Sequence, residues 1–180
     1  MPQPADLRWS IRPLQRSDDA TAFSSGQDSL DLWIAQHAWA CQQRRTAATQ
    51  VLVSAQPTSE RPEAGRVLGY YSLASTSIHT EGLPRRLSRG QPALLPAFLL
   101  ARLALDRSLQ GQGLGSVLLS HAVRAADHAS RIVAARLLVV DAIDEHAASF
   151  YRHYGFTPLA ADHRRRRLVA VIKHLVPPED

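Results

Sequence analysis

A long apolar run that ends in a glycine-rich turn constrains this chain more than any other feature of its sequence. Residues 97–106 (AFLLARLALD) are almost continuously apolar, which is typical of a central strand buried on both faces of a sheet. Glycines follow at positions 111, 113 and 115, and a helix is then expected up to Ala129. Its predicted buried stripe consists of Leu114, Leu118, Ala122 and Ala126, helped by Val117, Leu119 and Val123. A buried strand that passes through a bare turn into a helix predicts an α/β fold, with a mixed sheet, parallel central strands and flanking helices.

The remaining patterning fits the same class. Further strands are expected over residues 7–14, 50–55, 66–74, 135–141 and 168–175. A first helix is expected to begin at Ser29 and to end at Arg44 and Arg45. Another is expected over residues 145–154 and stops at Gly155. With 180 residues the chain is long enough for one domain with a substantial core.

The basic residues are almost all arginine, and they are clustered. The formal net charge is +5, and Lys173 is the one lysine among 21 basic residues. The clusters are Arg44 and Arg45, then Arg85, Arg86 and Arg89, and finally Arg164, Arg165, Arg166 and Arg167. They are either solvated surface side chains or a basic surface for a phosphate-rich partner. The last cluster also fits a solvated turn before the final strand.

Composition also bears on compartment and metals. Cys41 is the single cysteine, the N-terminus lacks a secretory pattern, and no apolar run is long enough to cross a membrane, so we expect a cytoplasmic protein. The eight histidines show no metal-ligand spacing, so no metal is expected.

The glycine turn is arranged as an anion site would be. The first amides of a helix have no intrahelical partner and lie at the positive end of its dipole, and glycine leaves room for a phosphate beside them. No lysine follows the glycines, as a Walker A loop requires, and the spacing does not match a dinucleotide fingerprint. A tight turn without a ligand remains the alternative at this point.

Two motifs then resemble one superfamily. The segment from Gln110 to Gly115 (QGQGLG) fits the Q/R-x-x-G-x-G/A motif of the GNAT acetyltransferases, and residues 141–156 (DAIDEHAASFYRHYGF) resemble their later segment. The resemblance implies a single GNAT domain over residues 1–180, with a core from about residue 7 to 175, that binds acetyl-CoA. The cofactor-binding residues that it implies are Gln110, Gly111, Gln112, Gly113, Leu114, Gly115, Ser116, Asp144, Ala148 and Phe150.

A narrower resemblance involves five shorter stretches. The stretches that are similar to the acetyltransferase toxins of bacterial toxin–antitoxin modules are residues 23–26 (FSSG), 30–33 (LDLW), 69–74 (GYYSLA), 102–106 (RLALD) and 150–151 (FY). Members of that group acetylate the α-amine of aminoacyl-tRNA and are usually held in check by a ribbon-helix-helix antitoxin. The resemblance thus implies an aminoacyl-tRNA substrate, such an antitoxin and a homodimer, with the arginine clusters as RNA contacts. Gln110 and Leu105 depart from it, because arginine and valine are common there.

The resemblance also assigns catalytic roles. Tyr151 is the candidate general acid, since a phenol keeps its proton at neutral pH, although a packing tyrosine is the alternative. Backbone amides of Leu103, Ala104 and Leu105 are expected to hold the oxyanion and the pantetheine arm. Asp144 equally fits the N-cap of its helix, and Tyr154 is expected to pack.

Other functions stay open on the sequence alone. One is acetylation of a small-molecule amine or a protein N-terminus, and another, of a different class, is a catalytically silent binding module with the same fold. The intact glycines and Tyr151 argue against the silent module.

Overall fold

The structure, a computed structural model, describes residues 9–54, 65–159, 162 and 166–176. Within them the strands are β1 (Trp9–Pro13), β2 (Ala48–Ser54), β3 (Val67–His79), β4 (Leu94–Leu105), β5 (Leu137–Asp141), β6 (Thr157–Pro158) and β7 (Arg167–Val171). The α-helices are α1 (Asp28–Gln36), α2 (Ala38–Gln43), α3 (Arg85–Ser88), α4 (Leu114–Ile132), α5 (Glu145–His153) and α6 (Ile172–Leu175). Two 3₁₀ turns are η1 (Thr80–Gly82) and η2 (Arg107–Leu109).

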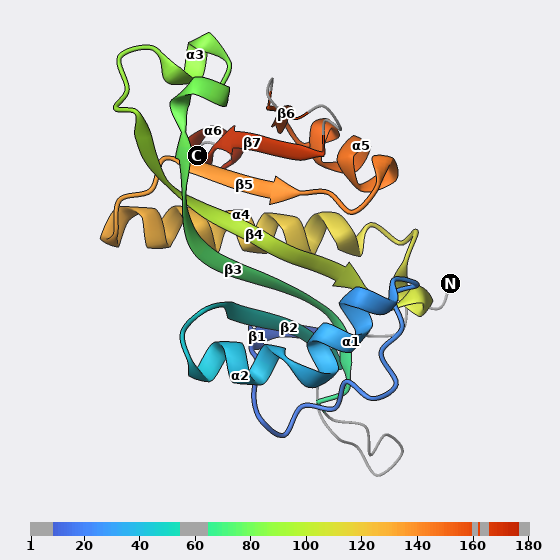
Figure 1. Cartoon of the computed structure of the whole chain (residues 1–180). Coiled ribbons are helices and arrows are strands. Elements are labelled where there is room, and N and C mark those ends of the chain that lie inside the picture. Colours follow the sequence, from blue (N-terminus) through green and yellow to red (C-terminus); the bar gives the residue numbers. More distant parts are fainter. Residues whose placement is uncertain (1–8, 55–64, 160–161, 163–165, 177–180) are drawn as a thin grey trace. The chain divides into compact units, whose positions relative to one another are not determined.

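Hydrogen bonds join the described strands into a sheet of seven in the order β1-β2-β3-β4-β5-β7-β6 (Figure 1). β4 runs parallel to β5, with Ala97 opposite Leu137 and Leu100 opposite Val140. β1 pairs antiparallel with β2, and β7 pairs antiparallel with both β5 and β6. The sheet is therefore mixed, and the parallel pair at its centre confirms the predicted α/β class.

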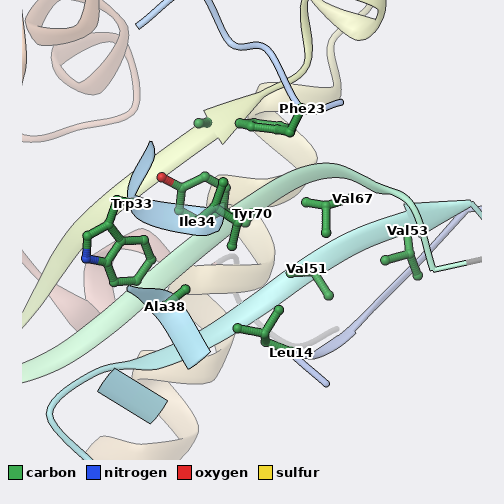
Figure 2. Close-up of a cluster of buried hydrophobic side chains, with 10 residues drawn as sticks. Leu14, Phe23, Trp33, Ile34, Ala38, Val51, Val53, Val67 and Tyr70 are labelled. Carbon is green, nitrogen blue, oxygen red and sulfur yellow. The ribbon is translucent and has the colours of Figure 1, made fainter. Parts of the chain in front are cut away.

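Two compact units divide the chain, and the first comprises residues 1–72 and 102–119. Figure 2 shows its core, which α1 and α2 close over β2 and the first half of β3. Trp33 stacks on the fully buried Tyr70 with their rings 5.7 Å apart, and Phe23 meets Tyr70 edge-on at the same distance. The Tyr70 hydroxyl donates to the Leu30 carbonyl at 2.9 Å, so its polar end is satisfied inside an apolar cluster.

Gly69 lies where β3 approaches the end of β4 in this unit. A Cβ added at Gly69 would meet the Leu105 side chain at 2.9 Å, Leu118 at 3.1 Å and the Ala104 carbonyl at 3.2 Å. Only glycine fits such an approach without displacing a neighbour. The glycine of the GYYSLA stretch is thus explained by packing against β4.

The second unit comprises residues 73–101 and 120–180. Every residue of β5 except Asp141 is buried, as expected for a strand covered on both faces. α5 lies beside β5 and β7 in Figure 1. The buried core of this unit consists of Ile78, Leu83, Leu87, Leu95, Ala97, Leu137, Val139, Leu159, Val169 and Val171.

The structure corrects two sequence-based expectations. The last strand ends at Val171, and residues 172–175 form the helical turn α6 instead of continuing it. Apolar residues run through both elements, so the pattern alone does not mark the change. Arg44 and Arg45 follow α2 and not the first helix, because α1 ends at Gln36.

The long helix α4 buries the stripe that its spacing predicted. Leu118, Leu119, Ala122, Val123 and Ala126 are buried, whereas the predicted members Leu114 and Val117 are half-buried. None of the helices in the described ranges combines the length and the apolar composition needed to cross a membrane.

We expect Gly69→Ala to lower the free energy of unfolding by about 1–3 kcal/mol, the usual cost of overpacking. The measurement is urea unfolding of the variant, alone and combined with Leu105→Ala. Removing the Leu105 side chain makes room for the new methyl group, so the penalty should shrink in the double variant. An equal penalty in both backgrounds would contradict the packing argument.

Candidate active site

The glycine turn between β4 and α4 has a backbone that L-residues rarely adopt. Gly111 has φ +75° and Gly113 has φ +80°. A Cβ at either position would find no atom within 4 Å, so open space lies beside the backbone. The sequence therefore needs glycine here for its conformation, and the result is room for a ligand directly against the chain.

The amides of this turn are available as donors. In the described residues, no backbone N–H from Gly111 to Gly115 donates to a carbonyl, whereas Ser116 donates both its N–H and its hydroxyl to the Gly113 carbonyl. Amides at the start of a 19-residue helix favour an anion. The turn therefore has the donors and the space that a pyrophosphate needs.

A buried carboxylate fixes the end of β4 immediately before the turn. Asp106 is 5% exposed and accepts from the Ser24 amide at 3.1 Å, the Ser108 amide at 3.0 Å and the Ser108 hydroxyl at 2.6 Å. Burial by itself would raise the pKa of Asp106, but these hydrogen bonds outweigh it and lower the pKa. The carboxylate therefore stays ionised and holds residue 24 against the strand end.

The Gln110 side chain does not extend toward the open side of the turn. Its Nε2 donates to the Ser25 carbonyl at 2.8 Å and to the Leu105 carbonyl at 2.9 Å. Gln112 likewise donates to the Ser108 carbonyl at 2.9 Å. Both glutamines support the turn through their side chains, so a ligand contact by either would be made through the backbone.

Tyr151 lies in the second unit, on α5, and is 6% exposed. Its ring meets Phe150 and Phe156 edge-on, at 5.3 and 5.6 Å between ring centroids. Burial raises the pKa of its phenol, and the hydroxyl makes no hydrogen bond to any described residue. The side chain is thus a protonated donor without a protein acceptor in the described part of the chain. Tyr154 is 38% exposed and packs against Phe150 at 5.0 Å.

The other predicted residues of this segment differ in what they can contact. The Asp144 carboxylate accepts from the Ala147 amide at 2.8 Å, so it is the N-cap of α5, the alternative that the sequence left open. Ala148 is fully buried, so its expected contact with the cofactor stays a prediction. Phe150 is half-buried and keeps exposed ring surface.

The structure separates engaged arginines from free ones. Arg167 makes a two-pronged pair with Asp141 at 2.7 Å, Arg166 donates to the Ile143 carbonyl, and Arg86 donates to the Thr157 hydroxyl at 2.7 Å. The remaining described members of the clusters are exposed, with side chains that make no hydrogen bond or ion pair to another described residue: Arg44, Arg45, Arg85 and Arg89. Arg164 and Arg165 lie outside the described residues.

Sequence reasoning missed two functional features of the first unit. The sequence analysis assigned no role to Asp106. An acidic residue at the end of an apolar strand nevertheless indicates a buried carboxylate that needs hydrogen-bond donors. Sequence reasoning also missed that the Arg102 guanidinium lies 4.3 Å from the Trp33 ring centroid, a cation–π contact between β4 and α1. Nothing in the spacing of these residues indicates that they meet.

Comparisons with known proteins agree with this geometry. The family described as "Acetyltransferase (GNAT) domain" matches residues 59–158. A protein named tRNA-acetylating toxin, from Mycobacterium tuberculosis (strain ATCC 25618 / H37Rv), is 37% identical over 145 residues, which are 81% of this chain and 82% of that protein.

Solved structures are similar over almost the whole chain. AtaT complexed with acetyl-methionyl-tRNAfMet superposes with a TM-score of 0.83 at 30% identity, covering 93% of this chain and 96% of that one. A mutant of the AtaT toxin bound to the C-terminus of the antitoxin AtaR and acetyl-CoA gives 0.77 at 29% identity, with the same two coverages. The family match spans more than half of the chain and includes β4, the glycine turn and α5, and on this evidence the protein belongs to the GNAT acetyltransferases.

Proposed function

We propose that this protein transfers an acetyl group from acetyl-CoA to the α-amine of an aminoacyl-tRNA and thereby acts as a translation-blocking toxin. The observation that carries the proposal is the 37% identity to a tRNA-acetylating toxin over 81% of the chain. The superposition on AtaT complexed with acetyl-methionyl-tRNAfMet supports the same substrate class.

The residues of the first unit fit acetyl-CoA. The amides from Gly111 to Gly115, which donate to no carbonyl among the described residues, would hold the pyrophosphate, and the positive φ of Gly111 and Gly113 leaves space for it. Gln110, Gln112, Leu114 and Ser116 contribute through their backbone and by supporting the turn. When bound, acetyl-CoA supplies the acetyl group as an activated thioester.

The end of β4 orients the reacting carbonyl. Backbone amides of Leu103, Ala104 and Leu105 are the proposed donors to its oxygen and to the pantetheine arm. The side chains of Ala104 and Leu105 are buried, so only their backbone is available for this role. Phe150 is the member of the later segment that still offers a side-chain surface to the arm.

Tyr151 is proposed to hold the proton that the departing thiolate takes up. Its raised pKa keeps the phenol protonated, and its hydroxyl is not engaged with another described residue. The acceptor needs little help from a base, because a free α-amine titrates at ~7.7–8.0 and an ester on its carboxyl lowers that further.

The remaining parts of the proposal concern the binding partners of the protein and its location in the cell. Arg44, Arg45, Arg85 and Arg89 are the proposed phosphate contacts, since their guanidinium groups are exposed and unengaged within the described part of the chain. A ribbon-helix-helix antitoxin and a homodimer remain part of the proposal, and the relative solved with an antitoxin segment supports the antitoxin. A charged-tRNA substrate also favours a cytoplasmic location.

The direct test is incubation with acetyl-CoA and total charged tRNA, followed by mass spectrometry of the aminoacyl ends. We expect an added acetyl group on at least one aminoacyl species. Acetylation of small amines or protein N-termini with none on tRNA would replace the proposal by those alternatives. No transfer to any amine would favour a silent binding module.

Gly113→Asp should abolish acetyl-CoA binding in titration calorimetry, because its carboxylate occupies the phosphate space and repels the ligand. Gly90→Asp is the matched control, since Gly90 also has positive φ (+71°) and open space around it. Both variants carry the same kind of backbone strain, but only the turn variant should lose acetyl-CoA. Unchanged affinity in Gly113→Asp would remove the turn from the site.

Tyr151→Phe should retain acetyl-CoA affinity and lose ~10²–10⁴-fold in kcat, the usual contribution of a general acid. Tyr154→Phe, three residues along the same segment and partly exposed, should stay close to the wild-type rate. Steady-state acetylation of aminoacyl-tRNA measures both. A Tyr151→Phe rate within about twofold of wild type would show that another group protonates the thiolate.

The double variant Arg85→Ala/Arg89→Ala should weaken tRNA binding and leave acetyl-CoA binding unchanged. Each lost phosphate contact reduces the slope of log K against log [salt] by roughly 0.7–0.9. Arg16→Ala/Arg124→Ala removes the same charge from two other exposed positions and serves as the control. Equal slopes for the two double variants would mean that net charge, and not this surface, binds the RNA.

A further inference from the structure

Gln110 uses both hydrogens of its side-chain amide on backbone carbonyls far apart in sequence. Its Nε2 donates to the Leu105 carbonyl at the end of β4 and to the Ser25 carbonyl, which lies 85 positions away along the chain. A primary amide nitrogen has two hydrogens, so these two bonds use its donor capacity in full. The side chain therefore links two segments and has no donor left for a ligand.

The first of these bonds fixes a peptide group that ends the central strand. The Leu105 carbonyl and the Asp106 N–H belong to the same planar peptide unit. The carbonyl accepts from Gln110 at 2.9 Å, and the N–H donates to the Leu68 carbonyl, also at 2.9 Å. Because the Leu105–Asp106 peptide group is hydrogen-bonded on both sides, it cannot rotate. This also holds the preceding backbone, which carries the proposed oxyanion donors.

The second bond completes the attachment of the loop that precedes α1. Ser24 donates its N–H to Asp106 at 3.1 Å and accepts from the Arg107 amide at 2.8 Å. Ser25 donates its N–H to Asp31 on α1 at 2.9 Å, and its carbonyl accepts from Gln110. The backbone groups of both serines are thus all engaged, and Gln110 closes the connection between this loop and the strand.

We infer that Gln110 is a positioning residue of the acetyl-transfer site, a role that rests on the function proposed above. It locks the Leu105 peptide to the Ser24–Ser25 loop and so sets the direction of the β4 amides that hold the reacting carbonyl. It does not bind the cofactor through its side chain. Its loss therefore lowers kcat, while the affinity for acetyl-CoA, which the turn amides provide, is retained.

Three substitutions of Gln110 distinguish the effect of losing its hydrogen-bond donors from the effect of adding a charge. Gln110→Met keeps the length and removes both donors without adding charge. Gln110→Glu keeps the shape but faces two carbonyl oxygens with a carboxylate. Gln110→Arg restores donors for both carbonyls. Gln112→Glu adds the same negative charge to the same turn but removes only the single hydrogen bond to the Ser108 carbonyl, so it is the comparison for the effect of charge.

The readouts are kcat and KM for aminoacyl-tRNA acetylation, acetyl-CoA affinity by calorimetry, and amide hydrogen exchange at Asp106 and Ser24. We expect Gln110→Met to lose about tenfold to 10²-fold in kcat, the scale of a small misplacement of reacting groups. Its acetyl-CoA affinity should stay within about twofold of wild type, and exchange at both amides should accelerate. The loss of kcat should be larger in Gln110→Glu than in Gln112→Glu. Gln110→Arg should keep most of the wild-type kcat.

Two results would overturn the inference. A loss of acetyl-CoA affinity in Gln110→Met that matches its loss of rate would make the side chain a cofactor contact. Unchanged kcat with accelerated exchange would make the link purely structural. If the wild-type protein acetylates no aminoacyl-tRNA, the proposed substrate fails instead, and the exchange measurement and acetyl-CoA affinity still decide whether Gln110 locks the strand end.

Discussion

The buried carboxylate of Asp106 holds together the part of the molecule on which the proposed chemistry depends. It lies where β4 ends and accepts three hydrogen bonds, two from amides and one from a hydroxyl. An ionised group in such a place is stable only if its hydrogen bonds replace the water that it has lost, and here they lower its pKa in spite of burial. The strand end, the turn and the loop before α1 are therefore built around one charge.

That polar junction is supported by an aromatic core in the same unit. Tyr70 lies between Trp33 and Phe23 (Figure 2), and the Arg102 guanidinium lies 4.3 Å from the centroid of the Trp33 ring. Aromatic contacts and a cation–π contact give α1 a defined orientation against β4. Since Asp31 on α1 also binds Ser25, this core fixes the loop from the helix side while Gln110 fixes it from the strand side.

The arginines illustrate why charge counted along a sequence is a poor guide to a binding surface. Arg167 belongs to the densest basic run of the chain, yet it is paired with Asp141 in a two-pronged geometry. Arg86 is engaged with Thr157, whereas its neighbours Arg85 and Arg89 are exposed without such a partner in the described residues. A guanidinium already paired gains less from a phosphate than a solvated one does, so Arg85 and Arg89 are stronger candidates for an RNA contact than Arg86 or Arg167.

The sequence by itself determined the elements whose signal is local. Continuous apolar runs predicted β4 and β5, helical spacing predicted the buried stripe of α4, and the glycines predicted a bare turn at its start. Only the tertiary structure decided which groups those elements bring together. The bond from Gln110 to Ser25, the contact of Arg102 with Trp33 and the burial of Ala148 depend on segments far apart in sequence. Periodicity records which face of an element is apolar, but a hydrogen bond needs two atoms within about 3 Å, and folding alone sets that distance.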